Sequence, residues 1–209
     1  MIIHNTMRAV LLAAVCLLTG CLARPPMEKQ SFIFAPPPPT AAKAAPGSRV
    51  LAIRTLQVAA AFEGRAFVCR TGEYSYESDP YAEFKIPPAE ALVSPVSAWV
   101  RAAGEFSAVA DAGSALKPDT LVEIHVAELY GDFRPAEPAK AVLAMRFVFL
   151  DAPHGLPGKV LLQKEYTRAA PLKARTAAAL IEGWNLALAQ ILAAATQDFG
   201  RLEANAQKP

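Results

Sequence analysis

The sequence predicts an α+β fold in which an antiparallel sheet is packed by two helices into a two-layer sandwich. Three consecutive segments, residues 121–129, 141–150 and 160–167, have strand-like apolar patterns, and turn-forming residues separate them, which favours an antiparallel meander. Residues 89–103 and 174–202 carry apolar side chains at spacings of three and four, as helices with one buried face do. With 209 residues, the chain can form one ordinary domain and a tail.

The remaining elements follow from local composition. Residues 50–58 are rich in β-branched and aliphatic side chains and predict the first long strand. Residues 67–70 and 74–77 are short strand signals on either side of a turn. Pro95 lies inside the first helix, so we expect the regular part to begin there, with Ser94 as the N-cap. The expected order is strand, helix, three strands, helix.

The second helix is long and mostly apolar, but polar residues interrupt the apolar run. They include Glu182, Asn185, Gln190 and Asp198, which fall on faces away from the apolar stripe. A membrane span needs about 20 consecutive apolar residues. We therefore expect this helix to pack on the sheet.

The N-terminus has the pattern of a lipoprotein signal peptide. Arg8 precedes an apolar run over residues 9–18, which is long enough for a signal sequence and too short to cross a bilayer. The run ends in Leu18-Thr19-Gly20-Cys21, which matches a lipobox. Cleavage between Gly20 and Cys21 would leave Cys21 to carry the lipid. The alternative is an ordinary signal peptide with an incidental cysteine.

Composition divides the chain into four parts. Residues 1–20 are the expected signal peptide, 21–48 a lipidated cysteine and proline-rich tether, 49–203 the α+β domain and 204–209 a C-terminal tail. A fully extended tether of 27 residues would reach roughly 80 Å. Within it, Ser31-Phe32-Ile33-Phe34 resembles a strand, and we expect it to pair with the sheet edge; the alternative is a sticky linker segment.

The composition gives little indication of catalysis, metal binding or nucleic-acid binding. A net charge of +2 is too balanced for a protein that binds nucleic acid by neutralising phosphates. Cys69 is the one cysteine left in the domain, so we expect no internal disulfide and assign it as a small buried hydrophobe. No catalytic motif is present, and we expect no catalytic residues, metal or cofactor. His125 and the carboxylates of Glu73, Glu77, Asp79 and Glu83 would be the candidates if the protein were a periplasmic enzyme; a solvated acidic loop is the alternative for the carboxylates.

Aromatic residues gather between residues 70 and 88, which we interpret as a loop. They are Tyr74, Tyr76, Tyr81 and Phe84, interspersed with prolines. Aromatic side chains that a loop cannot bury often mark an interface with a partner. The alternative is that Tyr81 and Phe84 cover the end of the sheet and the start of the helix.

The ordered set of these features resembles the ABC-type transport auxiliary lipoproteins, the PqiC-like family. The resemblance covers nearly the whole mature chain. It is carried by the lipobox, the short aromatic strand at residues 31–34 before a proline run, residues 50–70, the stretch Tyr81-Ala82-Glu83-Phe84 before Pro87-Pro88, and the closing helix with Trp184. The sequence departs from the family at Tyr81, where many members have Trp, and at Cys69, where many have Tyr.

The resemblance implies a non-enzymatic accessory role. Such lipoproteins are anchored in the outer membrane, on the periplasmic face, through lipid such as palmitate on the N-terminal cysteine. The implied partners are an MCE-domain protein and the permease and ATPase of an ABC transporter. Together they move lipids or other hydrophobic molecules across the envelope. The resemblance also implies that the protein assembles into a homo-oligomeric ring. Leu22 after Cys21 is consistent with the outer membrane, because it is not the aspartate of the inner-membrane retention signal. The alternative is an envelope-assembly or peptidoglycan-associated lipoprotein.

Overall fold

The computed structural model describes residues 28–40, 47–135 and 137–206 of the chain. Its elements are, in chain order, β1 (Gln30–Phe32), β2 (Val50–Val58), η1 (Ala60–Phe62), β3 (Ala66–Arg70), β4 (Tyr76–Phe84), α2 (Pro88–Ala103), β5 (Ala108–Ala110), β6 (Thr120–Asp132), β7 (Lys140–Asp151), η2 (Pro153–Gly155), β8 (Val160–Pro171) and α3 (Ala177–Ala206).

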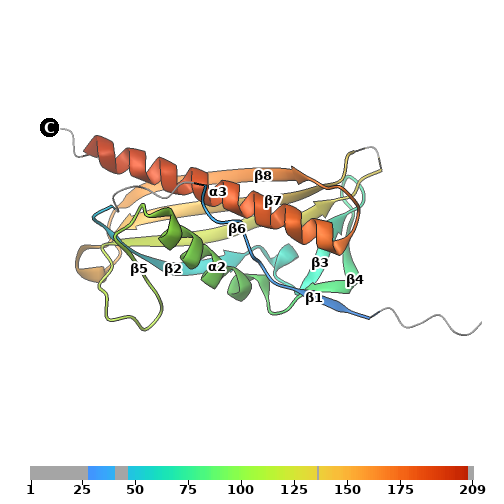
Figure 1. Ribbon diagram of the computed structural model, residues 1–209, viewed down its shortest axis with the longest axis horizontal. Coiled ribbons are helices and arrows are strands. Elements are labelled where there is room, and N and C mark those ends of the chain that lie inside the picture. Colours follow the sequence, from blue (N-terminus) through green and yellow to red (C-terminus); the bar gives the residue numbers. More distant parts are fainter. Residues whose placement is uncertain (1–27, 41–46, 136, 207–209) are drawn as a thin grey trace, which may run out of the picture.

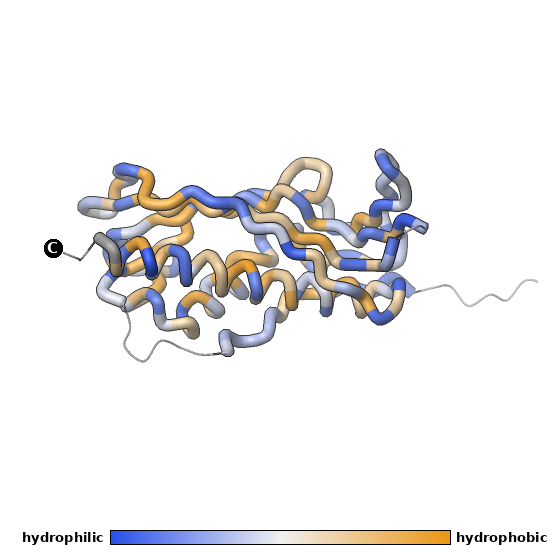
Figure 2. Tube along the Cα trace, turned by 90° about the horizontal axis from the view of Figure 1, so that it is seen from above, coloured by the Kyte–Doolittle hydropathy of each residue, from blue (hydrophilic) through white to orange (hydrophobic). Residues whose placement is uncertain are grey.

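The predicted two-layer α+β fold is confirmed. Eight strands form one sheet, and α2 and α3 both lie on the same side of it (Figures 1 and 2). Hydrophobic and hydrophilic residues alternate along the helices in Figure 2, as expected for helices with one buried face. The main core lies between the two layers and joins residues from both helices and from β1 to β8.

The sheet is mixed, whereas the sequence predicted antiparallel pairing. The meander β6–β7–β8 is antiparallel throughout, as predicted. The other side of β6 is divided: β2 runs parallel to its first part, and β3 runs parallel to its last residues, Gly131 and Asp132. Parallel pairing requires long crossover connections, and α2 lies in the connection from β2 to β6. Local alternation reveals hairpins but carries no information on such distant pairs.

Helix α2 begins at Pro88, seven residues before the start that we expected. Pro95 lies inside it, although a proline cannot donate the backbone hydrogen bond of an interior position. Buried residues on both sides of Pro95, including Leu92 and Trp99, hold the helix against the sheet layer. Gly104 ends it in the left-handed conformation, with φ of 72°, and donates its N–H to the carbonyl oxygen of Arg101.

Helix α3 begins after Thr176, whose hydroxyl oxygen accepts a hydrogen bond from the N–H of Ala179. Gly183 lets the helix approach the sheet closely, since a Cβ there would lie 2.7 Å from the Cβ of Ala141. Trp184 is fully buried beside this glycine. Within the described part of the chain, α3 alone has the length and hydropathy of a membrane span, yet half of that stretch is buried in the domain. Its packing against β7 and β8 agrees with the prediction of a core helix.

Residues 70–88 are not one loop, as we interpreted them from the sequence. Nine of them form β4, which pairs antiparallel with β3 and parallel with β1. Pro80 lies in β4 where the β3–β4 ladder is irregular. Prolines, tyrosines and acidic residues occur in strands near the border of a sheet as well as in loops, so the composition of this segment does not distinguish the two.

Candidate interaction surface

The segment that precedes the domain is attached to the sheet edge. Strand β1 pairs with β4 in parallel register, from Gln30 opposite Ala82 to Phe32 opposite Phe84, which confirms the predicted pairing of this segment. The ring of Phe32 lies 5.2 Å from that of Phe67. The ring of Phe34 stacks on that of Phe84 with centroids 4.9 Å apart. Both aromatic side chains of the segment thus join the domain core.

Beyond β1 the segment continues over the helix layer. The N–H of Ala35 donates to Oδ1 of Asn185 in α3, at 2.9 Å. The Nε1–H of Trp99 in α2 donates to the carbonyl oxygen of Pro37, also at 2.9 Å. Figure 1 shows this part of the chain, in blue, rising from β1 across the helices. We call residues 28–40 the strap, because they contact the sheet and both helices.

Glu83 joins the strap to the domain through ion pairs. Its carboxylate accepts from Lys29 at 2.5 Å and from Arg65, and its side chain is largely buried. The hydrogen bond from Lys29, together with the charge of Arg65, lowers the pKa of Glu83 below its ordinary value. The carboxylate is therefore ionised at neutral pH and serves as the anion between two cations.

The four aromatic residues that we predicted as an interface do not lie in one environment. Tyr74 is 87% exposed, and Tyr76 and Tyr81 are each almost half exposed, so these three remain available to a partner. Phe84 is 2% exposed and packs against Phe67 in the core, so its assignment to an interface is wrong. Strand alternation explains the difference, because Phe84 and Tyr81 project to opposite faces of β4.

The candidate acid–base residues are dispersed. Asp79 accepts hydrogen bonds from the backbone N–H groups of Tyr81 and Ala82, and Glu77 accepts one from the hydroxyl of Thr71. His125 is half-buried in β6, opposite Arg146 of β7. Across the described ranges, no three His, Cys, Asp or Glu side chains gather closely enough to hold a metal ion.

Cys69 lies in β3 and is partly buried. Burial, and secondarily the negative charges of Asp79 and Glu77, raise the pKa of its thiol to about 11. The thiol is therefore protonated at neutral pH, which is the opposite of what a nucleophile needs.

We predict that Cys69 is alkylated about 100-fold more slowly at pH 8 in the folded protein than in denaturant, because its thiolate fraction falls tenfold with each unit of pKa. The measurement is the rate of iodoacetamide labelling in a mature Cys21→Ser variant, in which Cys69 supplies the thiol. Equal rates in buffer and in denaturant would show that the strand environment does not protect this group.

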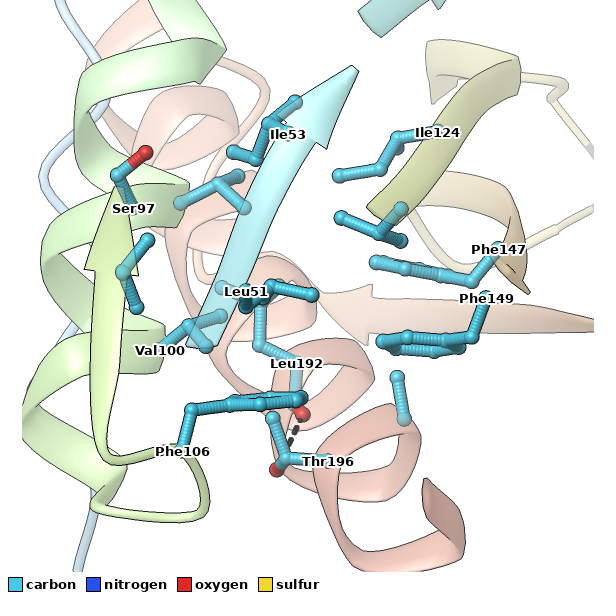
Figure 3. A pocket seen from close by; sticks show the side chains of 14 residues that line it. Leu51, Ile53, Ser97, Val100, Phe106, Ile124, Phe147, Phe149, Leu192 and Thr196 are labelled. Atoms are coloured by element: carbon cyan, nitrogen blue, oxygen red, sulfur yellow. Dashed lines mark hydrogen bonds between the residues drawn. The ribbon is translucent and has the colours of Figure 1, made fainter. Parts of the chain in front are cut away.

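A small cavity lies between the two layers (Figure 3). Apolar side chains from α2, α3, β2, β6 and β7 line it, among them Leu51, Val100, Phe149 and Leu192. The hydroxyl of Thr196 is turned back onto its own helix and donates to the carbonyl oxygen of Leu192. The volume is about 10 Å³, the lower limit for holding one water molecule. In this conformation the cavity has no room for an acyl chain.

Gly20 and Cys21, the predicted cleavage and lipidation residues, lie outside the described residues. The predicted site residues that the structure does place are thus the aromatic ones. Sequence reasoning missed the contacts that Asn185 and Trp99 make with the strap. Asn185 carried a partial signal, since it is a polar residue on an otherwise mostly apolar helix.

The fold is similar to that of solved structures. Protein XCC0632 from Xanthomonas campestris, described as a DUF330 protein, has a TM-score of 0.69 and 18% identity over 85% of this chain and 100% of that chain. A protein described as uncharacterised has a TM-score of 0.61 and 12% identity over 83% and 97% of the two chains. At these identities the likeness shows a shared fold. A comparison with protein-family models and with curated proteins finds no match.

Proposed function

We propose that the protein is a non-enzymatic outer-membrane lipoprotein that serves as an auxiliary component of an ABC/MCE-type system for transporting lipids or other hydrophobic molecules across the envelope. The observation that carries this proposal is the combination of a lipobox at residues 18–21 with a fold shared almost end to end with a DUF330 protein. DUF330 is another name for the PqiC-like family that the sequence resembles.

The physical organisation supports a docking component. A lipid on Cys21 would hold the chain at the membrane, since each buried CH₂ contributes about 0.8 kcal/mol and several acyl chains act together. The strap would transmit that attachment directly to the sheet and both helices, through β1, Asn185 and Trp99. Exposed tyrosines on the β3–β4 hairpin offer a surface for the proposed protein partners.

The anchor is tested with Cys21→Ser in cells that express the full chain. We expect loss of palmitate labelling and release of the protein from the membrane fraction. Cys69→Ser is the matched control, because Cys69 lies inside the domain, and it should retain both label and membrane association. A Cys21→Ser protein that still sediments with outer membranes would contradict the lipid anchor.

The transport role is tested by co-purification. The full-length lipoprotein is captured from detergent-solubilised envelopes, and the MCE-domain protein of the same cell is sought by mass spectrometry. The proposal expects its recovery, together with the permease and ATPase. Consistent recovery of peptidoglycan-binding proteins in their place would favour the structural alternative and count against the transport role.

A further inference from the structure

The strap shortens the connection between the domain and its proposed anchor. The sequence allowed a tether of 27 residues, but residues 30–37 are fixed to the domain by β1, Phe34, Asn185 and Trp99. Eight residue steps, with seven residues between them, separate Cys21 from Lys29, the first strap residue with an ion pair to the sheet. Fully extended, they reach roughly 25 Å. The edge formed by β1 and β4 is thus the part of the sheet that follows residue 21 most closely along the chain.

This edge carries three exposed apolar side chains. Ile33 is 65% exposed, and Tyr81 and Ile86 are each 44% exposed. We call Ile33, Tyr81 and Ile86 the edge patch. Ile33 directly follows β1, and Tyr81 directly precedes the β4 residues that pair with β1, so both are exposed beside this edge. The N–H of Lys85 donates to the carbonyl oxygen of Phe32, which brings the residues after β4 alongside those after β1.

Cationic side chains lie beside the patch. Lys29, Arg65 and Lys85 are exposed, and two of these cations share the carboxylate of Glu83. Glu28, also exposed, lies one residue closer to the proposed anchor. Isoleucine and tyrosine flanked by lysine and arginine are typical of surfaces that rest in the headgroup region of a bilayer, where the apolar part enters and the charged ends remain hydrated.

We infer that the edge patch rests on the phospholipid surface in which the protein is anchored, so that this edge faces the membrane. The inference depends on the proposed anchor at Cys21. Two observations carry it: the seven-residue connection that ends at this edge, and the apolar and cationic side chains exposed there. The lipid anchor and the patch then act as two contacts with one membrane, each of which strengthens the other by proximity.

Tryptophan quenching by lipid tests the contact. The full-length lipidated protein is reconstituted in vesicles of phosphatidylethanolamine with a minority of phosphatidylglycerol, with or without bromine on the acyl chains. Ile33→Trp reports on the patch. Leu156→Trp is the matched control: Leu156 is 68% exposed and follows η2 in the β7–β8 connection, at the end of the sheet where β6 begins. Trp99 and Trp184 are buried and common to both variants.

We expect brominated lipid to reduce the emission of I33W and to leave that of L156W unchanged. Ile86→Trp repeats the measurement from the connection between β4 and α2 and should also lose emission. If the variants float with the vesicles but I33W and I86W are quenched no more than L156W, the membrane contact is refuted and the anchor stands. If the wild-type protein does not float, the anchor itself fails, and the contact fails with it. Unchanged thermal unfolding of I33W, whose side chain is exposed, verifies the fold.

Discussion

Replacing Trp184 with alanine is expected to lower the free energy of unfolding by about 3–5 kcal/mol. The side chain is fully buried where α3 meets the sheet. Its ring contacts those of Phe67 and Phe84, at 4.9 and 5.6 Å. Truncation would leave a cavity at the junction of β3, β4 and α3, which the surrounding strands cannot fill. The measurement is a urea unfolding curve of the purified protein.

Trp184→Phe separates ring packing from hydrogen bonding. The Nε1–H of Trp184 donates to the carbonyl oxygens of Tyr130 and Val142, at 3.3 and 3.1 Å. Phenylalanine retains an aromatic ring but loses this donor, so we expect a smaller cost of about 1–3 kcal/mol. If the alanine variant were no less stable than the phenylalanine variant, the ring contacts would not support the junction.

The second large effect is expected at Phe34. Phe34→Ala should cost about 3 kcal/mol, because the ring is 4% exposed and stacks on Phe84. Ile33→Ala is the matched control from the neighbouring position, where an exposed side chain predicts a change within about 0.5 kcal/mol. Urea unfolding measures both.

Proteolysis shows whether the strap detaches in the Phe34 variant. Loss of the Phe34 ring weakens the packing of β1 on the domain. We therefore expect protease to cut residues 28–40 faster in Phe34→Ala than in Ile33→Ala. Equal cleavage rates in both variants and the wild type would mean that β1 and the hydrogen bonds to Asn185 and Trp99 hold the strap without the ring.

The parts of the fold predicted correctly from the sequence are those with local signals. The β6–β7–β8 meander has short turns and clear patterns, and the two helices have the periodicity of one buried face. The helix starts differ from the expected ones, by seven residues in α2 and by three in α3, because a helix end such as that at Thr176 depends on which group meets a free N–H. Parallel pairs such as β2 with β6 join residues almost 70 positions apart, which no local pattern encodes.

The interaction surface was predicted only in part, because it also depends on strand pairs that no local pattern encodes. The aromatic composition of residues 74–84 indicated a candidate interface, but composition does not show which side chains of a strand face the core. Phe84, opposite Phe32 of β1, is buried in the core, whereas Tyr81 is exposed. The lipobox can be recognised without knowledge of the fold, because the signal peptidase and the acyltransferase act on a short linear segment.

The strap also has a consequence for the order in which the protein acquires its structure. Ala35 binds Asn185, which is 150 positions later in the chain. Because a chain is synthesised from its N-terminus and distant contacts form late, this bond must wait for the final helix. Before that, residues 28–40 can already pair with β4 and Trp99, and the completed helix adds the last of the contacts that fix the strap to the domain.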